Sequence, residues 1–495
     1  MATTRRARPA APGRPATGRL VALGLAVLTV GATACTGDPE PDRPVAAAPG
    51  RAPSPTGSPA GGSPSAGTPT VDVPLAVAVH PTRDGLRLTA REVRRLQAGE
   101  VRSWAQLGEP GRRLVVGDLA SVRRSRAAVA LVPATAVGPR VGVARVDGVD
   151  PVRDPRAYAL TIDVAGDVAG GAPLPDRVTT VTVTGDVMLG RRVGARLAAV
   201  DDPSAALRPM ADLLAGADLT IGNLESTLSR AGAPRQGSDS FGASPAVLAG
   251  LRLAGFDVLS LANNHTGDYG PRALVRTVAR LRAAGFRPVG AGPDRSAAAE
   301  PVVVRRNGTT FGVVAFDAIG ETPAATAGSP GALRVSMQPR TGPLDEDELA
   351  RVLRIVRRLD RQVDVVLVVP HWGTQYTHRT VRDQRVVARA LVRAGADVVA
   401  GGHPHWVQGL EAVGGGLVAY SLGNFVFDMD FMRQTQEGVL LELTFWGSQL
   451  KNSRLVPYVI GADFSPRRAP GARGDAILAD VWRASRAPLR GTHAT

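Results

Sequence analysis

The sequence predicts an α/β protein, and three observations between residues 177 and 465 support this. Apolar runs typical of strands alternate there with segments of helical periodicity. Several helical segments end in Ala-Gly, where glycine can take the left-handed conformation that commonly ends a helix. Short polar clusters follow the apolar runs, at the points where strands would end. Because such alternation is typical of α/β folds, we expect one α/β domain over 177–465.

The elements of this domain can be placed from the same patterns. Helical spacing of apolar residues predicts helices at 203–215, 244–254, 271–284, 344–359 and 381–394. Helical patterns become rarer after residue 407, and the later apolar runs predict strands at 417–422, 439–445 and 455–460. The remaining residues, 466–495, are basic, and we expect a tail with one helix near 476–485.

Residues 1–35 have the features of an export signal. Five arginines lie before residue 20, and 20–30 is an apolar run of eleven residues, too short to span a bilayer. Small residues then lead to Cys35, the single cysteine of the chain, which cannot form an internal disulfide. We therefore expect a lipoprotein signal peptide with lipidation at Cys35, and a protein anchored to the membrane on the bacterial cell surface. Cleavage after Ala34 and retention as an uncleaved anchor are the alternatives.

Two linkers separate a smaller unit from the α/β domain. Residues 36–70 are rich in Pro, Gly and Ser, and such a segment buries too little apolar surface to fold, so we expect a disordered stalk. Residues 71–163 form a first folded unit, with strands expected at 73–79 and 127–132 and a helix at 90–98 capped by Thr89. Residues 164–176 contain a Gly/Pro-rich stretch and predict a second linker.

The net charge of +15 is carried almost entirely by arginine, since Lys451 is the only lysine. A basic, solvated surface is the plain interpretation, and attraction to an anionic polymer or lipid outside the membrane is the sharper one. The arginines are spread along the chain, without a basic stripe interleaved with aromatic residues. Nucleic acid is therefore not an expected partner.

The polar clusters contain the candidate site residues. They hold four of the seven histidines and comprise Gly185-Asp186, Asn223-Leu224-Glu225, Asn263-Asn264-His265, His371-Trp372-Gly373, and His403 with His405. Ligands collect at the carboxyl ends of strands in open α/β sheets. Carboxylate, amide oxygen and imidazole are the usual ligands of divalent transition metals. The sequence therefore predicts a metal site.

The clusters differ in how specific they are. Asp186 and Glu225, each taken alone, are also typical of a turn, a cap or a surface charge. His403 and His405 are the strongest signal, because side chains two residues apart on an extended chain point to the same side. Asn264 offers a carbonyl oxygen to a metal, and His265 can point past the metal toward a substrate.

The motifs together resemble the CapA family, named for poly-γ-glutamate capsule biosynthesis. Six ordered motifs carry the resemblance: 185–191, 223–225, 261–270, 371–373, 395–405 and 420–428. That family is similar to the calcineurin-like metallophosphoesterases, which implies a four-layer αββα sandwich of two mixed sheets. Residues 71–163 resemble one α/β lobe of a phosphate-binding-type solute-binding protein, through 88–93, 99–104 and 146–151.

The resemblance implies a site with two divalent metal ions. The residues that would hold them are Asp186 and His405 for one ion, Asn264, His371 and His403 for the other, and Glu225 as the bridge. His265 would be the general acid or the oxyanion partner. The residues expected to orient the imidazoles are Asn263, Asp268, Glu411 and Asn424. Mn, Fe, Zn or Co would suit such ligands, and the implied chemistry is in-line attack of water on phosphorus.

Three positions depart from the pattern of these families. Met188 stands where metallophosphoesterases usually have a metal-binding histidine, and Glu225 replaces their bridging aspartate. Gln375 stands where the CapA family usually has glutamate. One metal site is therefore expected to be poor in ligands.

Three functions remain open from the sequence. The first is a surface-anchored, metal-dependent hydrolase of phosphoesterase type that acts in the biosynthesis of a capsule or cell-envelope polymer. The second is a non-catalytic component of a polymer synthesis or export complex. The third is a solute-binding lipoprotein. Poly-γ-glutamate is an amide polymer, whereas metallophosphoesterases cleave phosphoesters, so the substrate stays open.

Overall fold

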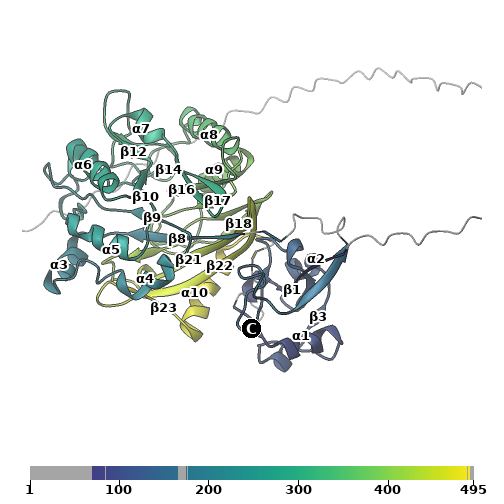
Figure 1. Cartoon of the computed structure of the whole chain (residues 1–495). Helices are drawn as coiled ribbons and strands as arrows, with labels where there is room; N and C mark the ends of the chain where they lie inside the picture. Colours follow the sequence, from purple (N-terminus) through teal and green to yellow (C-terminus); the bar gives the residue numbers. More distant parts are fainter. Residues whose placement is uncertain (1–69, 84, 166–173, 176, 488, 491–495) are drawn as a thin grey trace, which may run out of the picture. The chain divides into compact units, whose positions relative to one another are not determined.

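The computed structural model describes residues 70–83, 85–165, 174–175, 177–487 and 489–490 (Figure 1). These residues belong to one compact unit, Ala66–Thr495. The export signal with Cys35, the stalk at 36–69 and most of the linker at 164–176 lie outside the described residues, so these expectations stay predictions. Within the described part of the chain, each helix is too short or too polar to cross a lipid bilayer.

Residues 70–165 form a small sheet with two helices. Its strands run in the order β3-β4-β1-β5, and β7 also pairs with β1. The elements are β1 (Thr70–Val79), β2 (Arg87–Leu88), α1 (Ala90–Gln97), β3 (Val115–Val116), α2 (Leu119–Arg124), β4 (Ala128–Pro133), β5 (Gly142–Val143), β6 (Arg145–Val146) and β7 (Thr161–Ala165). The Thr89 hydroxyl accepts from the Glu92 N–H, and the Glu92 carboxylate accepts from the Thr89 N–H. This capping box confirms the predicted start of α1.

The first large sheet of the described residues has the order β11-β10-β9-β8-β21-β22-β23, with β20 paired to β8. Strands β8 to β11 run parallel, whereas β21, β22 and β23 follow in antiparallel pairs. The strands are β8 (Val178–Val187), β9 (Leu219–Leu224), β10 (Val258–Ser260), β11 (Arg287–Val289), β20 (Asn424–Val426), β21 (Glu437–Trp446), β22 (Gln449–Ile460) and β23 (Pro466–Arg468).

The second large sheet has the order β13-β14-β16-β17-β19-β18. Its middle strands β14, β16, β17 and β19 are parallel, and the two edge strands are antiparallel. The strands are β13 (Val302–Arg306), β14 (Thr309–Asp317), β16 (Val365–His371), β17 (Val398–Ala400), β18 (Leu410–Val413) and β19 (Gly416–Ala419), and a short separate pair is formed by β12 (Ala291–Gly292) and β15 (Gly331–Ala332). Strand β16 is buried at each position, which explains its unbroken Val and Leu run.

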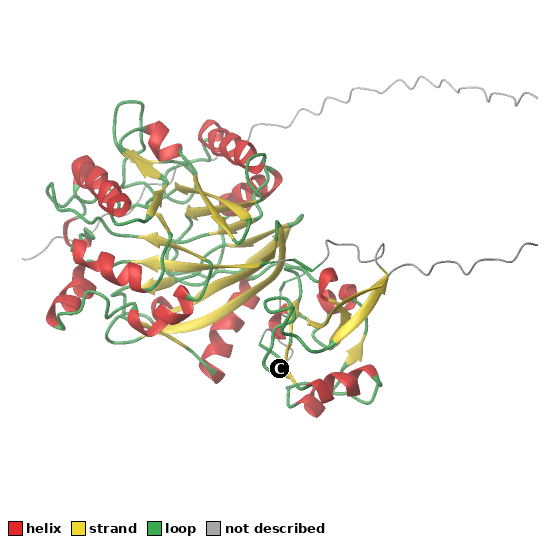
Figure 2. Cartoon of the chain, in the orientation of Figure 1, coloured by secondary structure: helices red, strands yellow, loops and turns green. Residues whose placement is uncertain are grey.

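The core has three layers of side chains in this part of the molecule. The middle cluster joins the two sheets, since it contains Val181 and Leu219 of the first sheet together with Phe311 and Leu367 of the second. A second cluster packs helices such as α6 (Gly270–Ala283) on the first sheet. A third packs helices α8 (Glu346–Asp360) and α9 (Arg382–Arg393) on the second. Helices α6, α8 and α9 therefore lie outside the paired sheets (Figure 2), and the mixed α/β class is confirmed.

The helices begin and end close to the predicted residues, with differences that have physical reasons. The predicted helix at 203–215 begins later, as α4 (Arg208–Ala215), and the helix at 244–254 is reduced to α5 (Leu248–Leu253) after a single 3-10 turn. The sequence analysis missed α3 (Arg191–Ala199) and α7 (Arg295–Ala299). Helix α3 buries only Val193 and Leu197, so its periodicity is too weak to recognise.

The C-terminal segment 466–495, expected as a basic tail, contains strand β23 and helix α10 (Gly471–Ala484). Ile477, Val481 and Trp482 of α10 are buried in the middle cluster. The segment is thus part of the folded core as far as it is described.

Candidate metal centre

Buried polar side chains gather at the carboxyl ends of parallel strands in both large sheets. Asp186 lies near the end of β8, Glu225 follows β9, and His371 is the last residue of β16. Asn264 and His265 come shortly after β10, while His403 and His405 come shortly after β17. The parallel pairing brings these strand ends to one edge of each sheet, so residues far apart in the sequence meet.

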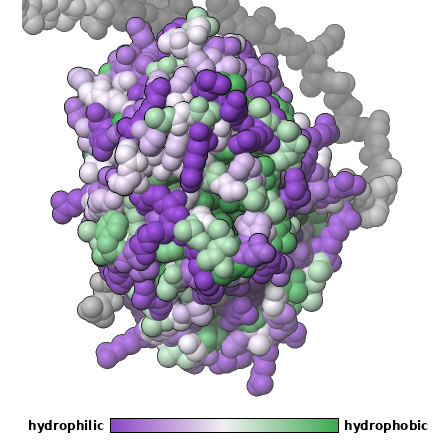
Figure 3. All heavy atoms as spheres, turned by 90° about the vertical axis from the view of Figure 1, so that its left-hand side faces the viewer, coloured by the Kyte–Doolittle hydropathy of each residue, from purple (hydrophilic) through white to green (hydrophobic). Residues whose placement is uncertain are grey.

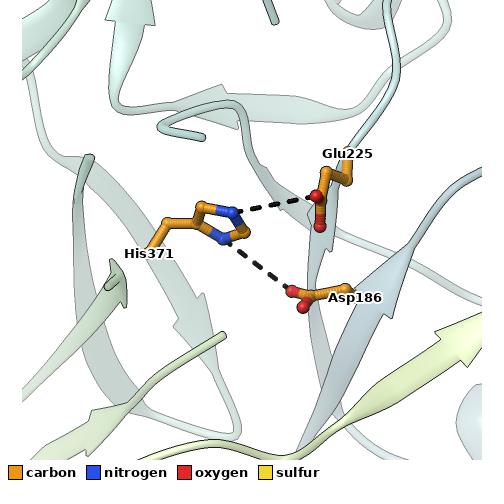
Figure 4. Close-up of side chains that lie close together, drawn as sticks. All are labelled: Asp186, Glu225 and His371. Carbon is orange, nitrogen blue, oxygen red and sulfur yellow. Dashed lines mark ion pairs between the residues drawn. The ribbon is translucent and has the colours of Figure 1, made fainter. Parts of the chain in front are cut away.

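Asp186, Glu225 and His371 form the centre of this cluster (Figure 4). Each is fully buried or nearly so, and one ligand atom from each lies within 4.8 Å of the others. The His371 ring lies between the two carboxylates, with Nδ1 3.9 Å from Asp186 Oδ1 and Nε2 3.8 Å from Glu225 Oε1. These distances are too long for direct hydrogen bonds. This buried Asp/Glu/His group could hold a metal ion.

Two amides complete the surroundings of His371. Asn264 Oδ1 lies 2.9 Å from His371 Nε2. The Asn223 amide donates to Asp186 Oδ1 at 2.8 Å and lies 3.3 Å from His371 Nδ1. Asn264 was among the predicted ligands, whereas Asn223 was not given a role. Its place two residues before Glu225, near the end of a fully buried strand, was the available signal.

The ring centroids of His403 and His405 lie 5.7 Å apart, but the reason that the sequence analysis gave for their proximity was wrong. The chain is not extended there, because His403 and His405 have φ of +91° and +58° in the left-handed region. The His403 N–H donates to Asp186 Oδ2 at 2.9 Å, which fixes the backbone against β8. The His403 ring centroid lies 5.0 Å from that of His371. Both His403 ring nitrogens are buried without a hydrogen-bond partner among the described residues.

The His405 ring contacts Asn424, one of the residues expected to orient the imidazoles. His405 Nδ1 lies 2.8 Å from Asn424 Oδ1 and 3.8 Å from Asp186 Oδ2. Gln375 Nε2 lies 3.4 Å from His405 Nε2, so an uncharged amide stands where a carboxylate was expected in the family pattern. Met188 is buried in the hydrophobic cluster beside the first sheet.

The position of His265 is fixed by contacts with Asp268, Phe241 and Asn263. Its Nδ1 lies 2.9 Å from Asp268 Oδ2, and the same Asp268 oxygen accepts the Phe241 N–H at 2.6 Å. The Phe241 ring stacks on the imidazole with centroids 3.5 Å apart. His265 Nε2 therefore faces the centre, 3.8 Å from Glu225 Oε1. Asn263 Oδ1 accepts the His265 N–H, which ties this predicted residue to the same loop.

Glu411 is the predicted site residue that the structure does not bring to the cluster. Its carboxylate accepts from both the Arg389 guanidinium and the Tyr420 hydroxyl. No hydrogen bond joins it to a candidate ligand among the described residues. Its place beside the His403-Pro404-His405 motif in the sequence was misleading, because β18 carries it away to the edge of the second sheet.

Asp317 is a buried carboxylate that the sequence analysis missed. It ends β14 and pairs in register with His371 of β16. It accepts from the Ile319 N–H at 3.0 Å and lies 3.1 Å from the Arg334 guanidinium. Burial raises the pKa of Asp317 to about 6. An apolar run that ends in Phe316-Asp317 was a sixth strand-end signal of the same kind as the others.

The electrostatics of the centre favour a cation. Burial raises the pKa of Asp186 to about 6, and burial together with the nearby Asp186 charge raises the pKa of Glu225 well above its usual range. Burial lowers the pKa of His371 and His403 well below the usual value, and that of His405 to about 4. The imidazoles are thus neutral and able to bind metal near pH 7, and a bound cation would favour the ionised form of both carboxyls.

A cavity of about 510 Å³ opens onto the cluster and is reached by Asn264, His265 and His405. Its rim combines opposite charges with aromatic rings, and the residues are Arg191, Arg192, Arg340, Asp239, Glu321, Asp428, Asp430, Phe241, Tyr376 and Phe431. On the face where α3, α5 and α6 lie, hydrophilic and hydrophobic residues are interspersed (Figure 3). The mixed rim suits a polar substrate with some apolar surface.

Comparison with known families decides the relationship. Residues 180–429 match the family described as bacterial capsule synthesis protein PGA_cap. This chain belongs to the PGA_cap family. The candidate ligands of the PGA_cap centre, from Asp186 to His405, all lie within the matched residues, and so do Asp317 and Asn424. Strands β21 to β23 and helix α10 lie beyond them.

The relatives of this PGA_cap protein include two named CapA. The capsule biosynthesis protein CapA of Bacillus anthracis is 32% identical over 268 residues, which are 53% of this chain and 63% of the relative. The PGA biosynthesis protein CapA of Bacillus subtilis (strain 168) is 29% identical over 271 residues, which are 54% of this chain and 68% of the relative. The chain thus spans about two thirds of the length of these relatives. These findings confirm the predicted resemblance to the CapA family.

Among solved structures, a hypothetical protein from Thermus thermophilus resembles this chain weakly. The TM-score is 0.36 with 17% sequence identity, and the match covers 57% of this chain and 99% of that protein.

Proposed function

We propose that this PGA_cap protein is a metal-dependent hydrolase of phosphoesterase type that acts in the synthesis of a capsule or cell-envelope polymer. One observation carries the proposal. Glu225 Oε1 and both ring nitrogens of His403 are buried without a hydrogen-bond partner among the described residues. A buried polar atom without a hydrogen-bond partner destabilises the fold unless a ligand interacts with it. Their convergence with Asp186 and His371 fits a bound divalent cation.

In this proposal the metal ligands are those of the buried cluster: Asp186, Glu225, Asn264, His371, His403 and His405. A bound divalent metal supplies Lewis-acid polarisation of the substrate and activation of water. The donor set mixes carboxylate, amide and imidazole, which suits Mn, Fe, Zn or Co. We propose that two such ions bind.

The chain's own residues would then position and protonate the substrate. Asp268 holds Nδ1 of His265, so the Nε2 edge of the ring faces the centre and can deliver a proton to a leaving group. Phe241 covers the face of that ring and keeps water from it. Asn424 holds His405 in place through its Nδ1.

The wider architecture supports this proposal. The order of helices, two facing sheets and helices agrees with the four-layer αββα sandwich expected from the metallophosphoesterase resemblance. The proposal includes an export signal and a lipid anchor at Cys35, which would hold the protein at the outer face of the membrane, where it would meet an envelope polymer. The lobe at 71–163 would act as a spacer or interaction domain.

A hydrolysis screen tests the proposal. The purified protein, loaded in turn with Mn²⁺, Fe²⁺, Zn²⁺ and Co²⁺, would be offered chromogenic phosphoesters and γ-linked glutamate polymers. We expect hydrolysis of at least one substrate, and a loss of about 10²–10⁴-fold in the His265→Ala variant with its metal content unchanged. Turnover that survives unchanged in His265→Ala, or none with any metal, would favour the non-catalytic role in a polymer synthesis or export complex.

A further inference from the structure

A second concave surface, which we call the arginine groove, shares no lining residue with the cavity at the metal centre. It lies between the segment 378–385 and the end of α10, and its volume is about 840 Å³. Its charged residues, as far as they are described, are Asp480 and the five arginines Arg379, Arg385, Arg483, Arg486 and Arg490. The rim of the cavity at the centre, by contrast, holds three arginines and four carboxylates. The groove therefore has a local excess of positive charge.

Most of this charge is not neutralised by neighbouring carboxylates. Arg483 pairs with Asp480, and Arg486 lies 3.8 Å from Glu411. Arg385 is held by the Thr380 and Val381 carbonyl oxygens, at 2.7 and 3.1 Å, rather than by an acid. For Arg379, Arg385 and Arg490, the described residues offer no carboxylate within ion-pair distance. Guanidinium groups that are not paired with a carboxylate favour an anionic ligand.

The arginine groove is connected to the metal centre by one loop. His378, which lines the groove, has Nδ1 2.6 Å from the Val407 carbonyl oxygen. The Gln408 amide donates to the Thr377 and Arg379 carbonyl oxygens, both at 3.1 Å. Val407 and Gln408 follow the His403–His405 segment in the sequence, separated from it only by Trp406. A chain bound in the groove would thus lie one loop away from the centre.

We propose that the arginine groove binds a stretch of an anionic polycarboxylate chain of the poly-γ-glutamate type. A chain with a carboxylate on each repeat can engage several guanidinium groups at once, which a single small anion cannot do. Each arginine can hold a carboxylate with two parallel hydrogen bonds. The choice of polymer class rests on the proposed function, whereas the binding of a polyanion rests on the groove itself.

The test compares two variants with the same change in net charge. Arg379→Glu/Arg490→Glu alters two exposed groove arginines without an ion-pair partner among the described residues. Arg354→Glu/Arg358→Glu alters two exposed arginines on α8 and serves as the matched control. Binding of a fluorescent γ-linked glutamate oligomer to the purified full chain is followed by anisotropy near 0.15 M salt, where long-range charge effects are largely screened.

We expect the groove variant to bind the oligomer at least about tenfold more weakly, and the control to change by less than about twofold. Equal affinities in the two variants, whether reduced or not, would overturn the proposal. Inorganic polyphosphate that competes better than unlabelled glutamate oligomer would overturn the polycarboxylate assignment. Metal content is measured on the same samples, so failure of the metal centre and failure of the groove are distinguished.

Discussion

At the scale of single residues, His403 bears two local costs, one in its backbone and one in its buried ring. A non-glycine residue in the left-handed region costs on the order of 1–3 kcal/mol, and its φ is +91°. Its ring is buried with both nitrogens unpaired among the described residues, which costs on the order of 1–3 kcal/mol. His405 has a similar backbone and burial, but its Nδ1 is paired with Asn424. The stabilities of variants that lack one or the other imidazole can therefore be compared.

We expect His405→Ala to destabilise the metal-free protein more than His403→Ala, by about 1–3 kcal/mol in the free energy of unfolding. Both changes leave a cavity of the same kind, but only His405→Ala leaves the Asn424 oxygen without its donor. Urea unfolding in the presence of a chelator measures the difference. Equal losses, or a greater loss for His403→Ala, would show that the His403 ring is satisfied in the metal-free protein.

The pKa of Asp186 predicts a pH dependence of metal binding. Because its pKa is raised to about 6, the carboxyl takes up a proton as the pH falls below about 6 and can no longer bind a cation well. The imidazoles stay neutral there, since the pKa of His405 is lowered to about 4. We expect the affinity for Mn²⁺ or Zn²⁺ to fall by about tenfold or more between pH 7 and 5. Titration calorimetry that finds the same affinity at both values would contradict this.

At the scale of elements, the centre depends on how closely the loop after β17 approaches the end of β8. A Cβ added to Gly402 would collide with the Asp186 carboxylate. The same Asp186 accepts the His403 N–H, so the loop and the strand end are held together at this point. Only glycine fits the approach.

We therefore expect Gly402→Ala to displace Asp186 and to lower metal affinity at least about tenfold, because a ligand of the cluster would be moved. Gly415→Ala is the matched control, since nothing lies within 4 Å of its added Cβ. Metal titration of both variants decides the matter. If Gly402→Ala binds metal as well as Gly415→Ala does, then Asp186 is not a ligand.

Much of this element-level arrangement could be predicted because each candidate residue follows an apolar strand. Val363–Val369 preceded His371 in the sequence, and β16 ends at that histidine. What the sequence could not supply was the distance between strand ends. Asn223 and Asp317 become neighbours of the centre only through the parallel pairing of β8 with β9 and of β14 with β16. Glu411 lies close to the His403–His405 segment in the sequence, but β18 places it at the edge of the second sheet, away from the cluster.

At the scale of the whole molecule, the candidate ligands come from both large sheets. Asp186 and Glu225 belong to the first sheet, and His371 and His403 belong to the second. A cation bound between them would join the sheets at one edge. A bound cation would therefore stabilise the folded protein relative to the unfolded chain, which lacks the assembled cluster.

We expect removal of the metal with a chelator to lower Tm by roughly 5–10 °C. Metal at 100 times its Kd stabilises a protein by about 2.7 kcal/mol, and 1 kcal/mol moves Tm by about 2–4 °C in a domain of this size. The His403→Ala/His405→Ala variant should melt at the same temperature with and without chelator. A chelator effect of equal size in that variant would place the stabilising ion elsewhere in the molecule.

The most direct test of the metal centre is elemental analysis of the purified protein beside the His403→Ala/His405→Ala variant. The account predicts divalent metal in near-stoichiometric amount in the unaltered protein and its loss in the variant. Equal metal in both proteins, or none in either after loading with Mn²⁺, Fe²⁺, Zn²⁺ and Co²⁺, would contradict it.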